Sequence, residues 1–262
     1  MRVVFDSLFV QNQAVQVPAF AGLGNYVSLF KDPGFRQVIG NTLVYAVVTV
    51  PVSVVLALLL ALRLDRPLRA VGLHRLAFFH PTILPMVSAA TIWLFMYAPG
   101  YGLVNVFLDR IGIGSQNWLG DPQLALPALM VVGLWKQTGY FMLFYLAGLQ
   151  NLPREVFDAA HIDGASGLRT LRHLTLPLLR GTTLFVTIIA VVDAFQTVDQ
   201  IYILTGGGPT NATSMLLFAV WQTLFSFLDV GRASAMSVIL IAALLVFSIA
   251  NFASVERRAT YE

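Results

Sequence analysis

Cysteine is absent from the sequence, and charged residues are scarce. Without a thiol the chain has neither a disulfide nor a thiolate metal site. Only 11% of the 262 residues are charged and 57% are hydrophobic, whereas a typical soluble domain is roughly 25% charged. The four histidines lack metal-ligand spacing, and we find no nucleophile elbow and no phosphate-binding loop. This composition excludes an ordinary soluble domain and gives no support to an enzyme.

Long uncharged stretches stand where the charges are missing. Residues 41–62 run for 22 residues without a charge, enough to cross a hydrocarbon core about 30 Å thick. Four later stretches are comparable, although Lys136 interrupts one of them and Asp193 and Asp199 interrupt another. We therefore predict an all-α membrane protein, a helical transmembrane bundle in a single domain over residues 1–262. Its five spans are expected at about 41–62, 76–98, 123–150, 181–205 and 233–255.

Arginine placement predicts which loops face the cytoplasm. Four arginines lie in 63–75 and four in 151–180, whereas 99–122 and 206–232 hold one each. Because positive residues concentrate on the cytoplasmic side, loops 63–75 and 151–180 and the C-terminus are expected inside. Five spans then place the N-terminus outside, and no signal peptide precedes it. The simplest explanation is a missing N-terminal helix, which makes six spans in the working protein.

The segment 152–177 is the longest polar interruption of the apolar sequence. Pro153 suits a first helical turn, and an acidic residue such as Glu155 suits the positive helix end. Gly164 is expected to end this helix because glycine adopts positive φ at little cost. A second short helix should then begin with leucines and stop at Pro177. Two short helices around a glycine turn can sit in a partner's groove, although an ordinary hairpin between spans is the alternative.

Several residues of this segment resemble a known loop. Asp158-Ala159-Ala160, Asp163-Gly164-Ala165, Leu174 and Leu176-Pro177 resemble the "EAA…G…I-LP" loop of ABC importer permeases. Aspartate stands at 158 where that family usually has glutamate, and leucine stands at 174 where isoleucine is usual. In that family the loop, here within 151–180, is the cytoplasmic coupling element that docks on the ATPase. The resemblance implies that the coupling residues are Glu155, Asp158, Ala159, Ala160, Asp163, Gly164, Ala165, Leu174 and Pro177.

Other segments resemble the carbohydrate-type branch of the same family, namely 20–26, 32–35 and the Gly-Gly-Pro of 207–209. The tripeptide 135–137 and the tail from 255 lean towards its glycerol-3-phosphate permeases. The resemblance implies a multi-pass permease subunit in a bacterial-type cytoplasmic (inner) membrane, forming half of a pathway for a carbohydrate or glycerol-phosphate solute. It implies a second permease chain as a heterodimer, two ATPase subunits, an extracytoplasmic substrate-binding protein and membrane lipid as partners. Neither a nucleic-acid partner nor a cofactor in this chain is expected, since ATP and Mg bind the ATPase.

Polar residues in the expected span 181–205 predict a solute pathway. On a continuous helix the four residues of this set fall within about 100° of arc, and such a stripe should face protein or water rather than lipid. They are Asp193, Gln196, Thr197 and Gln200. Lys136 and its neighbour Trp135 complete the candidate pathway. The alternative is that Asp193 and Lys136 pair and only hold two helices together.

Two other protein classes remain open from the residues alone. An ion-coupled secondary transporter would need inverted repeats and acidic ion sites near the midplane. Asp193 fits the second requirement, but no half of the chain resembles the other. A membrane scaffold without transport is disfavoured by the charges inside the spans.

Three local features carry smaller predictions. The arginines of 63–75 are expected to meet anionic headgroups, with a second ATPase contact as the alternative. Residues 214–228 are too short to cross and predict an interfacial or re-entrant helix. Pro51, Pro81 and Pro85 lie within spans, where proline kinks a helix and frees backbone carbonyls.

Overall fold

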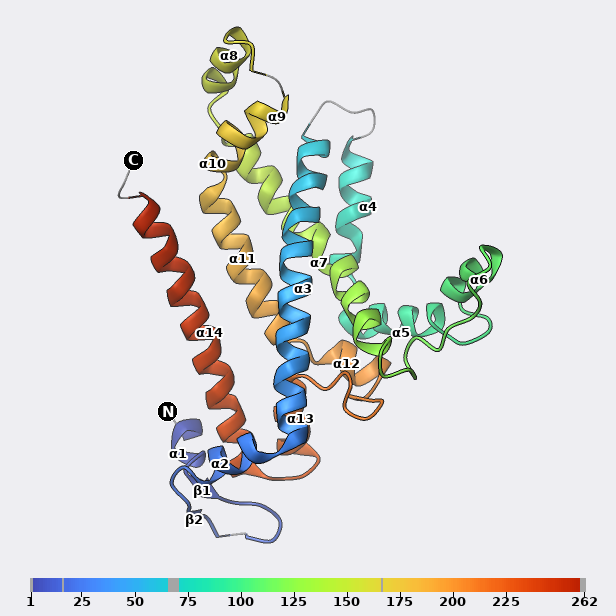
Figure 1. The fold of residues 1–262 in the computed structure, drawn as a ribbon, viewed down its shortest axis with the longest axis vertical. Coiled ribbons are helices and arrows are strands. Elements are labelled where there is room, and N and C mark those ends of the chain that lie inside the picture. The colour runs from blue at the N-terminus through green and yellow to red at the C-terminus, as the bar shows by residue number, and fades with distance from the viewer. Residues whose placement is uncertain (1, 16, 66–70, 166, 260–262) are drawn as a thin grey trace. The chain divides into compact units, whose positions relative to one another are not determined.

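The computed structural model describes residues 2–15, 17–65, 71–165 and 167–259, and the fold is mostly helical (Figure 1). Arg66 and Arg69, two of the arginines expected at the headgroups, lie outside the described residues. The elements before the middle of the chain are α1 (Arg2–Asp6), β1 (Phe9–Val10), β2 (Ala19–Phe20), α2 (Gly24–Lys31), α3 (Pro33–Leu64), α4 (Val71–Ile83), α5 (Met86–Met96) and α6 (Leu103–Arg110). The later elements are α7 (Ala125–Gln150), α8 (Arg154–Ile162), α9 (Gly167–Thr170), the π turn η1 (Leu171–Thr175), α10 (Leu176–Leu178), α11 (Arg180–Phe195), α12 (Asp199–Leu204), α13 (Leu216–Phe225) and α14 (Val230–Ala259).

The helical prediction is confirmed, with one small β-hairpin added. β1 and β2 pair antiparallel over two residues each, with Phe9 opposite Phe20. Helix α7 lies within two residues of its predicted start and ends where predicted. Helix α3 begins eight residues earlier than the uncharged stretch, because Asp32 and Pro33 provide a natural helix start.

Two of the expected helices are broken, which corrects the sequence prediction. The stretch 76–98 divides into α4 and α5 on either side of Pro85. The stretch 181–205 divides into α11 and α12, with Val198 at φ −127° between them. Proline explains the first break because it removes a backbone N–H. The second break contains no proline or glycine.

Among the described residues, two helices are long and apolar enough to cross a membrane alone, namely α3 and α14 through Asn251. Two bent pairs raise this number to four if each counts as one span: α4 with α5, and Gly167–Leu178 with α11. Helix α7 has 26 residues, about 39 Å at 1.5 Å per residue, but polar residues around Lys136 dilute its apolar character. The five-span count is therefore not confirmed by helix length and composition alone.

Helix α13 fits the prediction of a short, non-crossing helix at 214–228. It has ten residues, too few to cross, and its buried face joins an apolar core. The backbone N–H of Leu216 donates to the Thr42 hydroxyl of α3 at 2.9 Å, which caps the first turn of α13. Phe225 and Phe227 are exposed, as expected for residues at a membrane interface.

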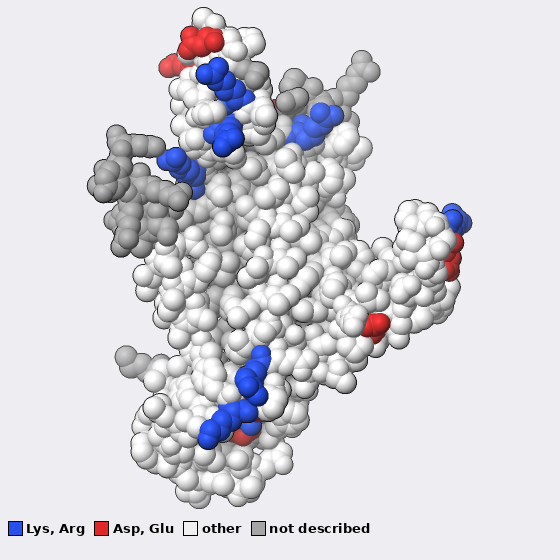
Figure 2. Space-filling model, in the orientation of Figure 1, with Lys and Arg blue, Asp and Glu red and all other residues white. Residues whose placement is uncertain are grey.

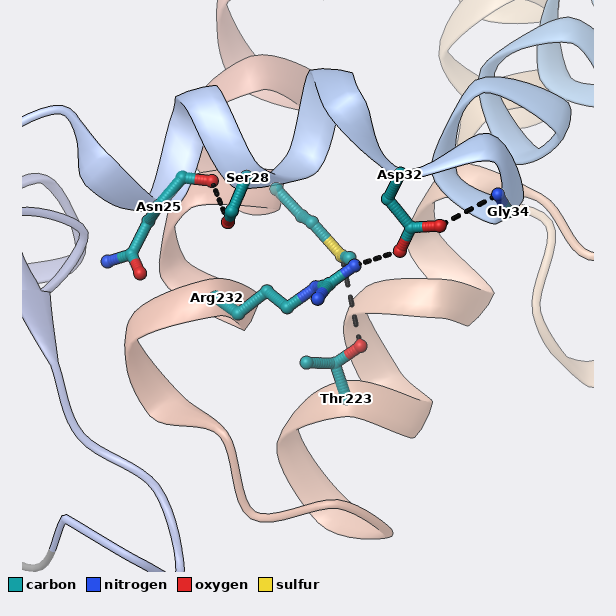
Figure 3. Close-up of polar contacts among 7 residues, drawn as sticks. Asn25, Ser28, Asp32, Gly34, Thr223 and Arg232 are labelled. Atoms are coloured by element: carbon teal, nitrogen blue, oxygen red, sulfur yellow. Dashed lines mark hydrogen bonds and ion pairs between the residues drawn. The ribbon is translucent and has the colours of Figure 1, made fainter.

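Two compact units divide the chain, and the first comprises 1–49, 85–133 and 191–250. Its core joins α2, the start of α3, α13 and α14, through Leu29, Phe35, Val38, Leu216, Ala219, Val220, Ala235, Met236 and Leu240. The guanidinium of Arg232 pairs beside this core with the Asp32 carboxylate, whose other oxygen accepts the Gly34 N–H at 2.8 Å (Figure 3). The Thr223 hydroxyl contacts the Met236 sulfur nearby, at 3.8 Å.

The second unit comprises 50–84, 134–190 and 251–262. Many of its buried side chains come from α3, α7 and α11, and Phe141, Tyr145 and Val186 are at most 1% exposed. Glycines let helices approach closely in this unit. A Cβ at Gly139 would lie 1.9 Å from the Phe78 carbonyl oxygen, so α7 meets α4 at a distance that only glycine permits.

Candidate functional site

The segment predicted to be a coupling loop folds as a chain of short helices, residues 152–178, which we call the coupling knuckle. It joins the end of α7 to the start of α11 and projects beyond both (Figure 1). Pro153 directly precedes α8, and Glu155 lies in its first turn, where a carboxylate is favoured by the helix dipole. Asp158, Ala159 and Ala160 follow within α8. The first short helix of the prediction is confirmed.

A glycine turn ends α8 as the sequence predicts. Gly164 has φ +74°, the left-handed conformation that glycine adopts without strain. The N–H of Ala165 donates to the carbonyl of Ala160 at 2.9 Å, and that of Gly164 donates to His161 at 3.1 Å. These two bonds form a Schellman motif, in which Asp163 is the C-cap of α8. The turn is therefore a defined structure rather than an open loop.

The second half of the knuckle differs from the prediction. The helix begins at Gly167 and passes through the π turn 171–175, where Leu174 lies, before α10. Pro177 lies inside α10 rather than stopping the helix, which ends one residue later. In the π turn the Leu176 N–H donates to the Leu171 carbonyl, five residues back. Hydrogen bonds of the π turn reach one residue further back than those of an α-helix. This pattern accommodates Pro177, which has no N–H to donate.

Two apolar side chains project from the knuckle on either side of Gly164. Ile162 is 86% exposed and Leu168 is 77% exposed. Figure 2 shows both carboxylates and guanidinium groups on the surface of the same segment. Exposed apolar groups rimmed by charges are typical of a protein interaction site. The coupling residues Glu155, Asp158, Ala159, Asp163 and Gly164 are also exposed, and Ala160, Ala165, Leu174 and Pro177 are half-buried.

A cavity of about 1220 Å³ lies behind the knuckle, within the second unit. Its lining residues come from α3, α4, α7, α8, α9 and the π turn and include Asp65, Arg75, Phe157, Asp158, His161 and Thr170. Arg75 turns toward the protein and donates to the Leu64 carbonyl at 3.0 Å, capping the end of α3. Arg75 is thus a helix cap, which corrects its expected placement at the headgroups. Arg63 is exposed.

The predicted pathway residues do not share one helix. Asp193 lies in the last turn of α11, Gln196 and Thr197 lie in the break, and Gln200 lies in α12. The predicted arc of about 100° requires a continuous helix, so the break overturns it. The Thr197 hydroxyl donates to the Asp193 carbonyl at 3.2 Å. Gln196 is exposed, while Asp193 and Thr197 are half-buried.

Gln200 is buried at 2% exposure and contacts a residue that the sequence analysis missed. Its Nε2 donates to the Tyr45 hydroxyl of α3 at 2.8 Å, and its buried Oε1 has no hydrogen-bond partner among the described residues. Gly133 makes room for this pair, since a Cβ there would lie 2.2 Å from the Tyr45 hydroxyl. Thr42, Tyr45 and Thr49 are all buried at helical spacing in α3. This row of polar residues along α3 is the feature of the sequence that could have identified Tyr45.

Lys136 is bound by backbone carbonyl groups. Its ammonium donates to three backbone carbonyls at the end of α4: Pro81 at 3.1 Å, Thr82 at 3.3 Å and Leu84 at 2.6 Å. An ammonium has three N–H donors, so these bonds account for all of them. An ion pair between Lys136 and Asp193, the alternative from the sequence, stays a prediction. Trp135, its neighbour in α7, is half-buried.

Known proteins resemble this chain over nearly its whole length. A family model described as "Binding-protein-dependent transport system inner membrane component" matches residues 21–259. The sulfoquinovosyl glycerol transport system permease protein SmoG of Agrobacterium fabrum is 36% identical over 242 residues, which are 92% of this chain and 79% of SmoG. The sn-glycerol-3-phosphate transport system permease protein UgpA of Brucella suis is 36% identical over 261 residues, which are 99% and 89% of the two chains.

A solved structure shares the fold. A chain of a bacterial alginate ABC transporter, crystallised in complex with an alginate pentasaccharide-bound periplasmic protein, superposes with a TM-score of 0.80. The match covers 88% of this chain and 81% of that chain at 21% sequence identity. At that identity the likeness establishes the architecture and leaves the solute open.

Proposed function

The chain belongs to the family of binding-protein-dependent transport system inner membrane components, and from that premise we propose how its parts work. It is a permease subunit of an ABC importer for a carbohydrate or glycerol-phosphate solute, not an enzyme. A separate ATPase hydrolyses ATP, and this chain forms half of the solute pathway. Relatives that transport sulfoquinovosyl glycerol and sn-glycerol-3-phosphate favour a polar, glycerol-linked solute.

The coupling knuckle carries the proposal for the mechanism. Its Schellman turn ends α8 in a defined conformation, and Ile162 before the turn and Leu168 after it are both largely exposed. We assign these two side chains as apolar anchors in a groove of the ATPase, where buried apolar groups contribute most of the binding free energy. Glu155, Asp158 and Asp163 form the charged rim of that contact. Movement of the ATPase groove is thereby transmitted to α7 and α11, which adjoin the knuckle.

Asp193, Gln196 and Thr197 remain the proposed pathway residues. They gather where α11 breaks, and a broken helix offers backbone groups as well as side chains to a polar solute. The hydrogen-bonded pair of Gln200 and Tyr45 is buried and stabilises the position of this stretch. Lys136 and Trp135 lie on α7, and the bonds of Lys136 favour a supporting role over solute contact.

We propose a multi-pass topology in one transmembrane domain, with the knuckle inside. Five crossings follow if α7, α4 with α5, and α11 with its flanking helices are added to α3 and α14. This placement leaves the arginine-rich loops in the cytoplasm. A sixth, N-terminal crossing helix stays a prediction.

The proposed assembly contains a second permease chain, two ATPase subunits that bind ATP and Mg, and an extracytoplasmic binding protein. The alginate transporter of the same fold is bound to a periplasmic protein, which supports the last of these partners. An ion-coupled transporter, the alternative from the sequence, is not favoured by any of the relatives compared.

Reconstitution tests the proposed function. The chain would be placed in proteoliposomes with its partner permease, ATPase and binding protein, and solute uptake would be measured with sodium and proton gradients collapsed. Uptake should require ATP and the binding protein, and an ATPase unable to hydrolyse ATP should abolish it. Uptake that persists with the inactive ATPase would instead support ion coupling.

A further inference from the structure

The break between α4 and α5 leaves backbone carbonyls that need a partner. Helix α4 ends at Ile83 and α5 begins at Met86. Pro85 has no N–H, so the Pro81 carbonyl lacks the donor that a continuous helix would provide four residues later. Inside a membrane such groups must be satisfied by protein, because lipid offers no donor.

Lys136 supplies that partner from the neighbouring helix. Its Nζ lies 2.6 Å from the Leu84 carbonyl oxygen and also contacts the carbonyls of Pro81 and Thr82. A positive charge is favoured at this end of α4, because carbonyls at a helix C-terminus carry partial negative charge. The three oxygens therefore converge on one cation.

A second set of contacts keeps α7 at this distance from α4. Gly139 lies one turn after Lys136 and permits the close approach to the Phe78 carbonyl. The Thr82 hydroxyl donates to the Lys136 carbonyl at 3.0 Å, a bond in the opposite direction. Residues three apart share a helix face, so Lys136 and Gly139 serve the same contact.

We propose that the carbonyls of Pro81, Thr82 and Leu84 form a cation site that the Lys136 ammonium occupies as a built-in cation. Ion-driven transporters use carbonyls at broken helices to bind sodium or protons. Here the chain's own ammonium fills that position, so the site needs no ion from solution. Lys136 is thus a positioning residue, which fixes the segment from which α5 starts. Helix α5 packs against α12, which carries Gln200.

Chemical rescue tests this inference. Lys136→Ala removes three carbons and the ammonium group, the same set of atoms as propylammonium. In the purified, assembled transporter we expect a lower thermal unfolding midpoint and uptake reduced at least about tenfold, since three partly buried carbonyls lose their hydrogen-bond donor. Propylammonium chloride should raise the variant's midpoint relative to choline chloride at equal ionic strength. Propanol, which has the same length without the charge, should not.

Matched variants separate the cation from simple loss of packing. Lys136→Arg keeps a cation with several donors and should retain assembly and most of the midpoint, whereas Lys136→Met keeps the volume and should not. Gln137→Ala, one residue along α7, should show no response to propylammonium. The midpoint needs no knowledge of the solute, so this result stands apart from the proposed function.

Two outcomes would overturn the cation site. One is a Lys136→Met variant with the wild-type midpoint and uptake, because the carbonyls would then need no cation. The other is an equal effect of propylammonium on wild type and Lys136→Ala. If Lys136→Ala does not assemble, the Arg and Met variants decide: assembly of both or of neither contradicts the proposal, and assembly of Lys136→Arg alone supports it.

Discussion

Arg232, in the first turn of α14, pairs with the carboxylate of Asp32, 200 positions earlier in the chain (Figure 3). Asp32 ends α2, and its other oxygen accepts the N–H of Gly34 at the start of α3. One carboxylate therefore joins the ends of three helices. Asn25 and Ser28 form a further bond within α2, where the Ser28 hydroxyl donates to the Asn25 carbonyl at 2.8 Å.

The first prediction concerns the strength of this pair. Arg232→Met should lower the free energy of unfolding by about 1 kcal/mol or less, because partly exposed ion pairs are screened by water. The side chains of Arg232 and Asp32 are 32% and 37% exposed. The measurement is the thermal unfolding midpoint of the purified complex, and Arg36→Met serves as the control for loss of a nearby charge. A loss of several kcal/mol would contradict the assignment.

The same pair has a defined pH dependence. Burial alone would raise the pKa of Asp32, but the Gly34 N–H and the Arg232 guanidinium together hold it below its ordinary value of 3.8. A carboxyl group whose pKa is lowered in the folded state stabilises the fold fully at pH values above its ordinary pKa. This stabilisation is lost as the pH falls through the lowered pKa. The difference in thermal unfolding midpoint between wild type and Arg232→Met should therefore stay constant at neutral pH and shrink below about pH 4. A difference that grows in acid is incompatible with this ion pair.

Gly164 gives the second prediction, because its backbone conformation and not its surroundings restricts substitution. A Cβ at Gly164 would meet no atom of the described residues within 4 Å, but φ is +74°. Gly164→Val should therefore strain the turn, by about 1–2 kcal/mol for a left-handed residue, and substrate-stimulated ATP hydrolysis should fall sharply. Gly164→Asn is the control, since asparagine tolerates this conformation. Wild-type stimulation and uptake in Gly164→Val would remove the turn from the coupling mechanism.

Topology gives the third prediction. Because the chain has no cysteine, single cysteines report their own positions without background. Ser115→Cys and Asn211→Cys should react with an impermeant maleimide from outside the cell. His161→Cys should react only after permeabilisation. Labelling of His161→Cys and Asn211→Cys from the same side would disprove both the topology and the coupling role.

The break after α11 gives the fourth prediction. Asp193→Asn and Gln196→Ala should reduce solute uptake at least about tenfold while assembly and basal ATP hydrolysis persist, because each removes a group proposed to bind the solute. Loss of assembly in Asp193→Asn, or wild-type uptake in both pathway variants, would assign Asp193 and Gln196 a structural role.

Tyr45→Phe leaves the buried Gln200 amide without its hydrogen-bond acceptor and should lower the free energy of unfolding by about 1–3 kcal/mol.

Composition and local pattern were sufficient for part of this structure. The apolar stretch 123–150, in which Lys136 is the one charged residue, predicted α7 within two residues, and glycine at 164 predicted a left-handed turn. The helix and the turn both depend on residues close together in the sequence, whose backbone preferences determine the local conformation. The same local rules predicted a stop at Pro177, but the π turn before it removed the need for the missing N–H.

Long-range contacts account for what the sequence could not provide. An apolar stretch has the same composition whether its helix is continuous or broken, so hydropathy gave no sign of the break at 196–198. The partners of Lys136 lie more than fifty residues away, and Gln200 meets Tyr45 across 155 positions. Such pairs depend on which helices pack together, and charge spacing along one helix does not specify this.

Cross-linking from the knuckle tests whether it docks on the ATPase subunit. Ile162→Cys and Leu168→Cys each place one thiol on a side chain that is more than three-quarters exposed, in a chain with no other cysteine. In membranes that contain the assembled transporter, a short bifunctional reagent should link both variants to the ATPase subunit. Phe227→Cys, which is also on an exposed side chain but lies after α13, should give no such link. Cross-links to the ATPase from Phe227→Cys and none from the two knuckle positions would contradict the account.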